Sequence, residues 1–254
     1  MKPEFNHCYT PDPGHRFHSR LGKLGFTADP KTVEHPGDHS CRFIMLTSRD
    51  RRLRLYLEFV SAPPKDSRRP GVSFSVNGSL EAYFKAMRGD RLLRPNLKHR
   101  NYEWKTRGTK ERLPGWNFLT FKRRSAFAEV WFTEYEDTLG PTKRRKSTNR
   151  LFRHANGALS IIALEFDATP SGRRYLEAAL RRKLGPVTRL ACGTDLILRP
   201  ARRTAFRRVV IKARSLAAFR RKAKTAVPTT HEGRPALLIK NPAGFWDIVV
   251  KEKR

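Results

Sequence analysis

Hydrophobic positions near the start of the chain follow first a strand and then a helix. A short apolar strand is predicted over 4–10. Asp12 follows it as a natural helix N-cap, with Pro13 suited to the first helical position. Phe17, Leu21 and Leu24 then recur at the spacing of one buried helix face. The chain therefore opens with a strand that leads into an amphipathic helix.

A second strand-like pattern ends this opening unit at Arg54–Ser61. Leu55 and Leu57 alternate with Tyr56 and Glu58, and a period of two places the leucines on one face and the polar pair on the other. The whole unit is predicted as a strand, a helix and three strands, at 4–10, 13–25, 26–33, 41–47 and 54–61.

The same order of elements recurs three more times. Further units begin at Gly71, Leu159 and Arg208, and their helices follow Ser79, Thr169 and Ser215. We therefore predict an α+β fold of four strand–helix–strand modules, the last two shortened. The alternative is an ordinary α+β domain without a repeat. The predicted organisation is a domain at 1–140 (modules 4–62 and 71–136), a basic linker at 141–157 and a second, smaller pair of modules at 158–254.

Composition adds a basic surface to this picture. The 254 residues include 54 Lys and Arg against 23 Asp and Glu, a formal net charge of +31, while sixteen Phe and four Trp argue for a folded chain. Such a charge attracts polyanions such as nucleic acid, anionic lipid and acidic metabolites. The basic clusters are spread along the chain, which equally fits a generally basic protein.

The three cysteines are odd in number and form no CxxC pair, which fits buried free thiols in a reducing compartment. No apolar signal segment and no run of 18 apolar residues occur. We therefore expect a cytoplasmic protein without a membrane span.

Several short motifs resemble one known family. FNHCYTPD, RLGKLGFTADPKTVEHPG and LYLEFV resemble the first module of glyoxalase-like proteins in the vicinal oxygen chelate superfamily. GWNFLTF, VWFTEYED and HANGALSI are similar to later stretches of the same group, so the resemblance reaches to about residue 165. It implies repeated βαβββ modules whose curved mixed sheets pair and form clefts, and the order of strands and helices agrees with the periodicity.

The resemblance also implies a site on the outer strands of the first two modules. It gives His7, Glu58 and Glu134 as metal ligands, with Glu58 and Glu134 as catalytic residues. Zn²⁺, Fe²⁺, Mn²⁺ and Ni²⁺ are the divalent ions that suit imidazole and carboxylate ligands, and a scaffold without metal is the alternative. Tyr56, His35 and His39 are expected to line the substrate cleft.

Two functions from different classes follow. One is a glyoxalase-like protein that binds a small anionic molecule, with metal-dependent lyase, isomerase or dioxygenase chemistry as the implied activity. The other is a non-catalytic basic module that binds nucleic acid or another polyanion. Whether the modules pair within one chain or across a homodimer stays open.

Overall fold

The computed structural model describes residues 1–35, 39–49, 53–62, 69–100, 105–107, 115–122, 129–135 and 149–252. Most of the predicted basic linker, residues 141–148, lies outside these ranges, while its last part forms the short 3₁₀ helix η2 (Asn149–Phe152).

The first module has a strand, a helix and three strands in the predicted order, but its second strand lies at Thr32–His35 instead of 26–33. Asp12 lies at the turn between the strand and the helix, where Gly14 and His15 both adopt positive φ. This kink lets the Asp12 carboxylate accept the backbone N–H groups of Phe17 and His18 at 2.8 and 2.9 Å, so it caps the helix from one turn further back than expected. The elements are β1 (Pro3–Pro11), η1 (Pro13–His15), α1 (Arg16–Lys23), β2 (Thr32–His35), β3 (His39–Thr47) and β4 (Arg54–Ser61).

The second module repeats this order from Gly71 on, with one additional short strand after its helix. The Ser79 side chain accepts the Ala82 N–H and caps the helix, as the sequence predicts. Its elements are β5 (Gly71–Val76), α2 (Leu80–Met87), β6 (Pro95–Arg100), β7 (Lys105–Arg107), β8 (Trp116–Phe121) and β9 (Glu129–Tyr135). The short β7 pairs with β2 of the first module.

The last two modules are shorter than the first two but differ from each other. The third has two strands after its helix, and the fourth keeps three because Val227–His231 pairs with the strand that follows it. The elements are β10 (Ala158–Ala168), α4 (Pro170–Leu180), β11 (Val187–Arg189), β12 (Asp195–Pro200), β13 (Ala205–Ala213), α5 (Leu216–Lys222), β14 (Val227–His231), β15 (Arg234–Ile239) and β16 (Asp247–Glu252).

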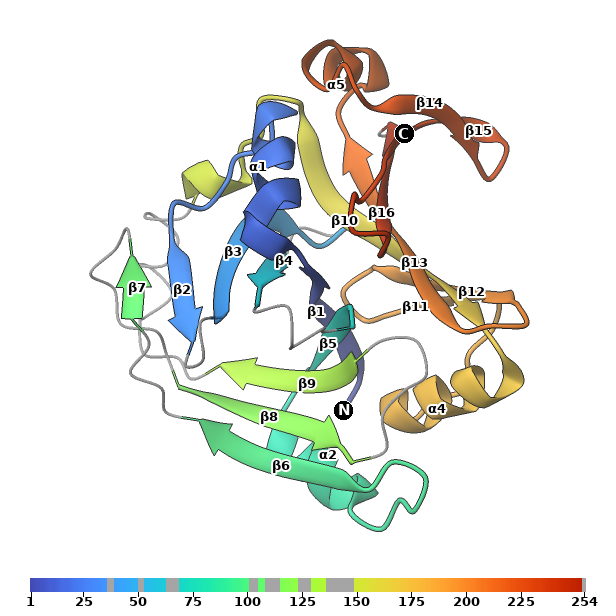
Figure 1. Ribbon diagram of the computed structural model, residues 1–254. Coiled ribbons are helices and arrows are strands. Elements are labelled where there is room, and N and C mark those ends of the chain that lie inside the picture. Colours follow the sequence, from blue (N-terminus) through green and yellow to red (C-terminus); the bar gives the residue numbers. More distant parts are fainter. Residues whose placement is uncertain are drawn as a thin grey trace.

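Strand pairing shows that the four modules are copies of one plan. In each module the first strand runs parallel to the last, in the pairs β1–β4, β5–β9, β10–β12 and β13–β16. Modules one and two join through antiparallel β1 and β5, and modules three and four through antiparallel β10 and β13. The two halves, blue to green and yellow to red in Figure 1, are linked by a bridge between β3 and β10. The modules therefore pair within the chain.

The main hydrophobic core holds residues of all four long helices, among them Phe17, Tyr83, Leu176 and Phe219. Each half also has a small apolar cluster on the opposite face of its strands. We call the face with Tyr9, Val33, Cys41 and Val60 the first cup, and the face with Ala163, Ile197, Val210, Ala236 and Val249 the second cup. Both cups lie on the side of the strands that faces away from the core.

Candidate functional site

Each of the four strands that form the first cup in module one contributes a side chain that is able to bind a metal ion. These are His7 on β1, His35 on β2, Cys41 on β3 and Glu58 on β4. Directly opposed residues of antiparallel strands point to the same side, and Val33 lies opposite Cys41. Strand alternation then brings His35 to the cup face together with Cys41.

The donor atoms of three of these residues converge. One ligand atom each from His35, Cys41 and Glu58 lie within 4.8 Å of one another, and His35 Nε2 is 3.0 Å from Cys41 Sγ. Glu58 connects this group to the fourth residue, because its Oε2 lies 3.5 Å from His7 Nε2. Nitrogen, sulfur and oxygen donors at such separations match the ligands that Zn²⁺ and related divalent ions take in proteins.

His7 is held in a neutral form that suits a metal ligand. Burial lowers the pKa of its imidazole to about 3, so the ring is uncharged at neutral pH. Its Nδ1–H donates to Asn6 Oδ1 at 2.7 Å, which leaves a lone pair on Nε2. That lone pair faces the Glu58 carboxylate, so two acceptor atoms lie opposite each other as the ligands of a shared cation do.

Aromatic side chains from both modules surround His7. The Tyr56 ring stacks on the imidazole with centroids 4.3 Å apart, and Trp131 of β9 meets it edge-on at 5.3 Å. Across the cup, the hydroxyls of Tyr56 and Tyr135 lie 2.5 Å apart. Burial raises the pKa of both phenols, so they stay protonated and can donate hydrogen bonds. This wall joins the two modules and keeps the imidazole nine-tenths or more buried.

The structure does not bring Glu134 to His7 and Glu58. On β9, Trp131, Thr133 and Tyr135 face the first cup, and alternation turns Glu134 to the helix side. There its carboxylate accepts the backbone N–H of Leu80 at 3.1 Å, at the start of α2. It also accepts the Asn117 amide at 3.0 Å. The predicted ligand set of His7, Glu58 and Glu134 is therefore corrected, because Glu134 caps a helix.

The remaining predicted cleft residues lie on the cup face. Tyr56 shares the face of Glu58, and His39 lies opposite His35 in the register of β2 and β3. The sequence interpretation missed Cys41, which it treated only as a buried thiol. The signal was present, since Cys41 is two residues beyond His39 and alternation puts both on one face.

Gly71 permits the close packing of the cup wall. A Cβ atom at this position would lie 2.2 Å from a ring carbon of Tyr9 and 2.5 Å from one of Trp131. We expect Gly71→Ala to lower the free energy of unfolding by about 1–3 kcal/mol, because two packed rings must move. Urea unfolding measures this change.

Gly22 offers a matched control for that substitution. It lies inside α1, and a Cβ there would meet nothing within 4 Å. Gly22→Ala should therefore stabilise the protein by about 0.5–1 kcal/mol through helix propensity. Equal effects of the two substitutions would contradict the close approach at Gly71.

Comparison with known proteins places this geometry in a fold family. No family model and no curated protein sequence matches the chain significantly. Among solved structures, it is similar over 100% of both chains to a hypothetical protein from Staphylococcus aureus, with a TM-score of 0.61 and 10% identity. It is also similar to an extradiol ring-cleaving dioxygenase from B. fuscum, with a TM-score of 0.57 and 14% identity over 100% of this chain and 72% of that one.

A third similar structure is the Mn(II)-bound glyoxalase from Novosphingobium aromaticivorans. The TM-score is 0.57 with 8% identity, over 98% of this chain and 86% of that one. Across the ranges that the structure describes, no helix is long and apolar enough to cross a membrane. The four paired modules and these similarities agree with the motifs in the sequence, and the chain has the fold of the vicinal oxygen chelate superfamily.

Proposed function

We propose that the first cup binds a divalent metal ion and, with it, a small anionic molecule. One observation carries this proposal: His35, Cys41 and Glu58, from three strands, present ligand atoms within 4.8 Å of one another. His7 would complete the set through Nε2, which already faces Glu58. A thiolate among the ligands favours Zn²⁺ over the harder cations, with Fe²⁺, Mn²⁺ and Ni²⁺ as the other candidates.

The reaction class that fits this site is metal-dependent lyase, isomerase or ring-cleaving dioxygenase chemistry. An extradiol dioxygenase and a Mn(II)-bound glyoxalase share the fold, which supports these classes for the present chain. When bound, a divalent ion acts as a Lewis acid that polarises substrate oxygens.

The side chains around the metal would orient the substrate and shield it from water. The Tyr56 and Tyr135 hydroxyls, 2.5 Å apart, are protonated donors that can orient an anionic substrate. Glu58 is the residue expected to act in both binding and chemistry, because its carboxylate belongs to the ligand group and also faces His7. The apolar patch of Tyr9, Val33 and Val60 excludes water from that side of the site.

Metal analysis of the purified protein tests the proposal. We expect about one divalent ion per wild-type chain, and a large loss of bound metal in Glu58→Gln and in His7→Ala, because each removes a ligand. Mass spectrometry of metal content after dialysis measures this.

Glu134→Gln is the matched control, since it makes the same change on the other face of the sheet. It should keep the metal content of the wild type. A wild-type protein that neither carries nor takes up metal would overturn the proposal, and so would metal loss in Glu134→Gln but not in Glu58→Gln.

A further inference from the structure

The second cup contains a cavity that is separate from the proposed metal site. Its volume is about 490 Å³, in the range of small-molecule sites. It lies on the strands of modules three and four and the turn between β15 and β16. The lining residues are Glu165, Asp167, Arg199, Arg207, Arg208, Lys240, Asn241, Gly244, Phe245 and Asp247.

The charges of this cavity are arranged in two levels. The three carboxylates lie deep, with exposed fractions of 1% for Glu165 and 17% for both Asp167 and Asp247. The four cationic side chains that line it are 42–66% exposed. A molecule that enters the cavity therefore meets guanidinium and ammonium groups first, which favours an anion.

The carboxylates are already engaged by these cations. Arg199 Nη2 and Arg208 Nη1 each lie 3.2 Å from an oxygen of Glu165, and the buried His231 ring donates to the same carboxylate through Nε2. Arg207 Nε donates to Asp167 at 2.5 Å. Lys240 Nζ lies 3.1 Å from Asp247. Since the carboxylates are neutralised in this way, the cavity is poorly suited to a metal ion.

The arginines keep further donors for a ligand. A guanidinium has five N–H groups in a planar fork that matches phosphate and carboxylate oxygens. Among the described residues, Arg199, Arg207 and Arg208 each use one N–H in a hydrogen bond to a carboxylate. The carboxylates thus fix the direction of the guanidinium groups, while most of their donors remain available to a ligand.

The wall beside these charges is rigid. Asn241 Nδ2 donates to Thr10 Oγ1 at 3.0 Å, and Trp246 Nε1 donates to the Tyr9 carbonyl at 3.0 Å, so the β15–β16 turn is tied to β1 of the other half. Trp246 is fully buried. A preformed wall lowers the entropic cost of binding a ligand.

We infer that the second cup is a binding site for a small organic anion, which carries a phosphate or carboxylate group for the arginines and an apolar part for Phe245. This inference is independent of the proposed function, because it rests on side chains of the other half of the chain. The size of the cavity favours a small molecule over a nucleic-acid backbone, whose binding would use the open basic surface.

Titration calorimetry with phenyl phosphate, inorganic phosphate and benzoate at about 0.15 M salt tests the inference, since surface charges are then largely screened. We expect saturable binding of phenyl phosphate. Arg207→Gln together with Lys240→Gln should weaken it at least about tenfold, because two cations are lost. The single Lys240→Gln change, at an exposed side chain, should weaken it in the same direction and serves if the double variant folds poorly. Binding of inorganic phosphate would indicate a phosphate group on the ligand, and binding of benzoate would indicate a carboxylate group.

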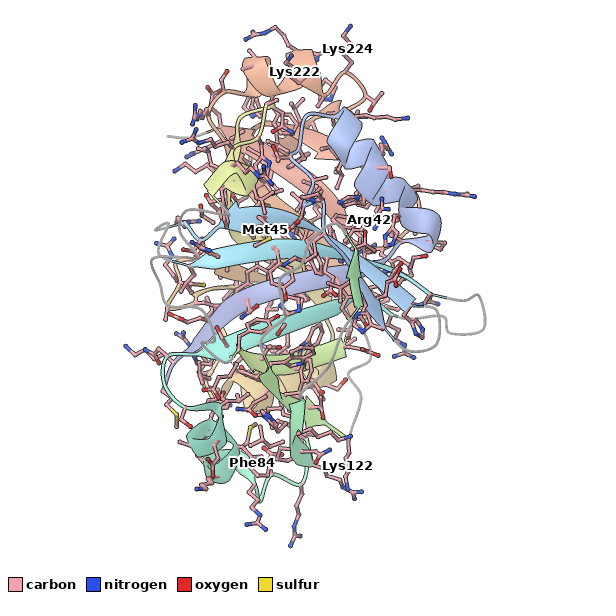
Figure 2. All side chains as sticks on the ribbon, turned by 90° about the vertical axis from the view of Figure 1, so that its left-hand side faces the viewer. Arg42, Met45, Phe84, Lys122, Lys222 and Lys224 are labelled. Atoms are coloured by element: carbon pink, nitrogen blue, oxygen red, sulfur yellow. The ribbon has the colours of Figure 1, made fainter. Side chains whose placement is uncertain are left out.

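Lys222→Gln together with Lys224→Gln is the matched control. It removes the same charge from the last residue of α5 and the turn that follows it, where both lysines are exposed at one end of the molecule (Figure 2). Affinity should be unchanged in this control and in Glu58→Gln. Equal weakening by both double variants would overturn the inference in favour of general charge attraction. Loss of binding in Glu58→Gln alone would overturn it too, by assigning the anion to the first cup. If a short single-stranded DNA binds more tightly than phenyl phosphate and displaces it, the inference of a small-molecule site is overturned and the ligand is a nucleic acid.

Discussion

Saturating Zn²⁺ is expected to raise the melting temperature of the wild-type protein by about 5–10 °C. A ligand at about 100 times its dissociation constant stabilises the folded state by about 2.7 kcal/mol. For a chain of this size, each kcal/mol corresponds to about 2–4 °C. The stabilisation arises because the three donor groups of His35, Cys41 and Glu58 meet only in the folded sheet. Thermal unfolding under reducing conditions, with and without Zn²⁺, measures the increment.

Cys41→Ser should reduce this increment to less than about 2 °C. Serine keeps the size of the side chain but removes the thiolate, and loss of a ligand weakens metal binding by more than the 10–100-fold typical of outer residues. Cys192→Ser is the matched control, since Cys192 is also a buried free cysteine but contacts the backbone N–H of Phe5. Its increment should equal that of the wild type. An unchanged increment in Cys41→Ser would show that the metal binds elsewhere in the protein. No increment in the wild type would contradict the existence of the metal site.

The repeat was predictable because its signals are local. Alternation in β4 correctly separated Leu55 and Leu57, both fully buried, from Tyr56 and Glu58 on the cup face. Helix starts were equally clear, since Ser79 and Ser215 cap α2 and α5 as expected. These features depend on neighbours within a few residues, which a single sequence records.

It was harder to predict which side chains point to the cup and which to the core where both sides of a strand are apolar. In β9, Trp131 faces the cup and Phe132 faces the core, so the pattern gives no sign of which side is which. The family resemblance assigned Glu134 to the cup, and the apolar pattern of β9 gave no reason to reject that assignment, although Thr133 and Tyr135 occupy this face. A β-bulge between Phe5 and His7 shifts the alternation in β1, and the residue types at these positions do not predict it. The site itself depends on such registers.

The strand β14 was missed for a different reason. Val227–His231 contains a proline and few apolar residues, as suits an edge strand, and β15 is its partner among the described strands. Its importance lies in His231, which reaches the buried Glu165 from that edge. A contact between residues 66 positions apart in the chain has no local signal.

Glu165→Gln is expected to lower the free energy of unfolding by about 3 kcal/mol at neutral pH. Its carboxylate is 1% exposed and is shared by two arginines and His231. The amide cannot compensate the two guanidinium charges or accept as many charge-assisted hydrogen bonds. Both arginines are partly exposed and can turn toward water, which keeps the loss near the lower end of the range for a broken buried ion pair. Urea unfolding measures the change.

Glu232→Gln is the matched control for that loss. Its carboxylate also contacts His231, at 3.4 Å, but is 49% exposed, so the change should be below about 1 kcal/mol. Similar losses of unfolding free energy in Glu165→Gln and Glu232→Gln would show that the burial of Glu165 does not increase its contribution to stability.

The stability contributed by Glu165 should also depend on pH in a defined window. Burial alone would raise the pKa of this carboxyl group, but the hydrogen bond and charge of His231, together with Arg199, lower it from 4.5 to about 2. Because the folded-state pKa is the lower one, the contribution is complete above about pH 4.5 and is lost as pH falls toward 2. The difference in unfolding free energy between the wild type and Glu165→Gln should therefore shrink across this window, since glutamine does not titrate. A difference that stays constant from neutral pH down to about pH 3 would mean that the charge of Glu165 does not stabilise the second cup.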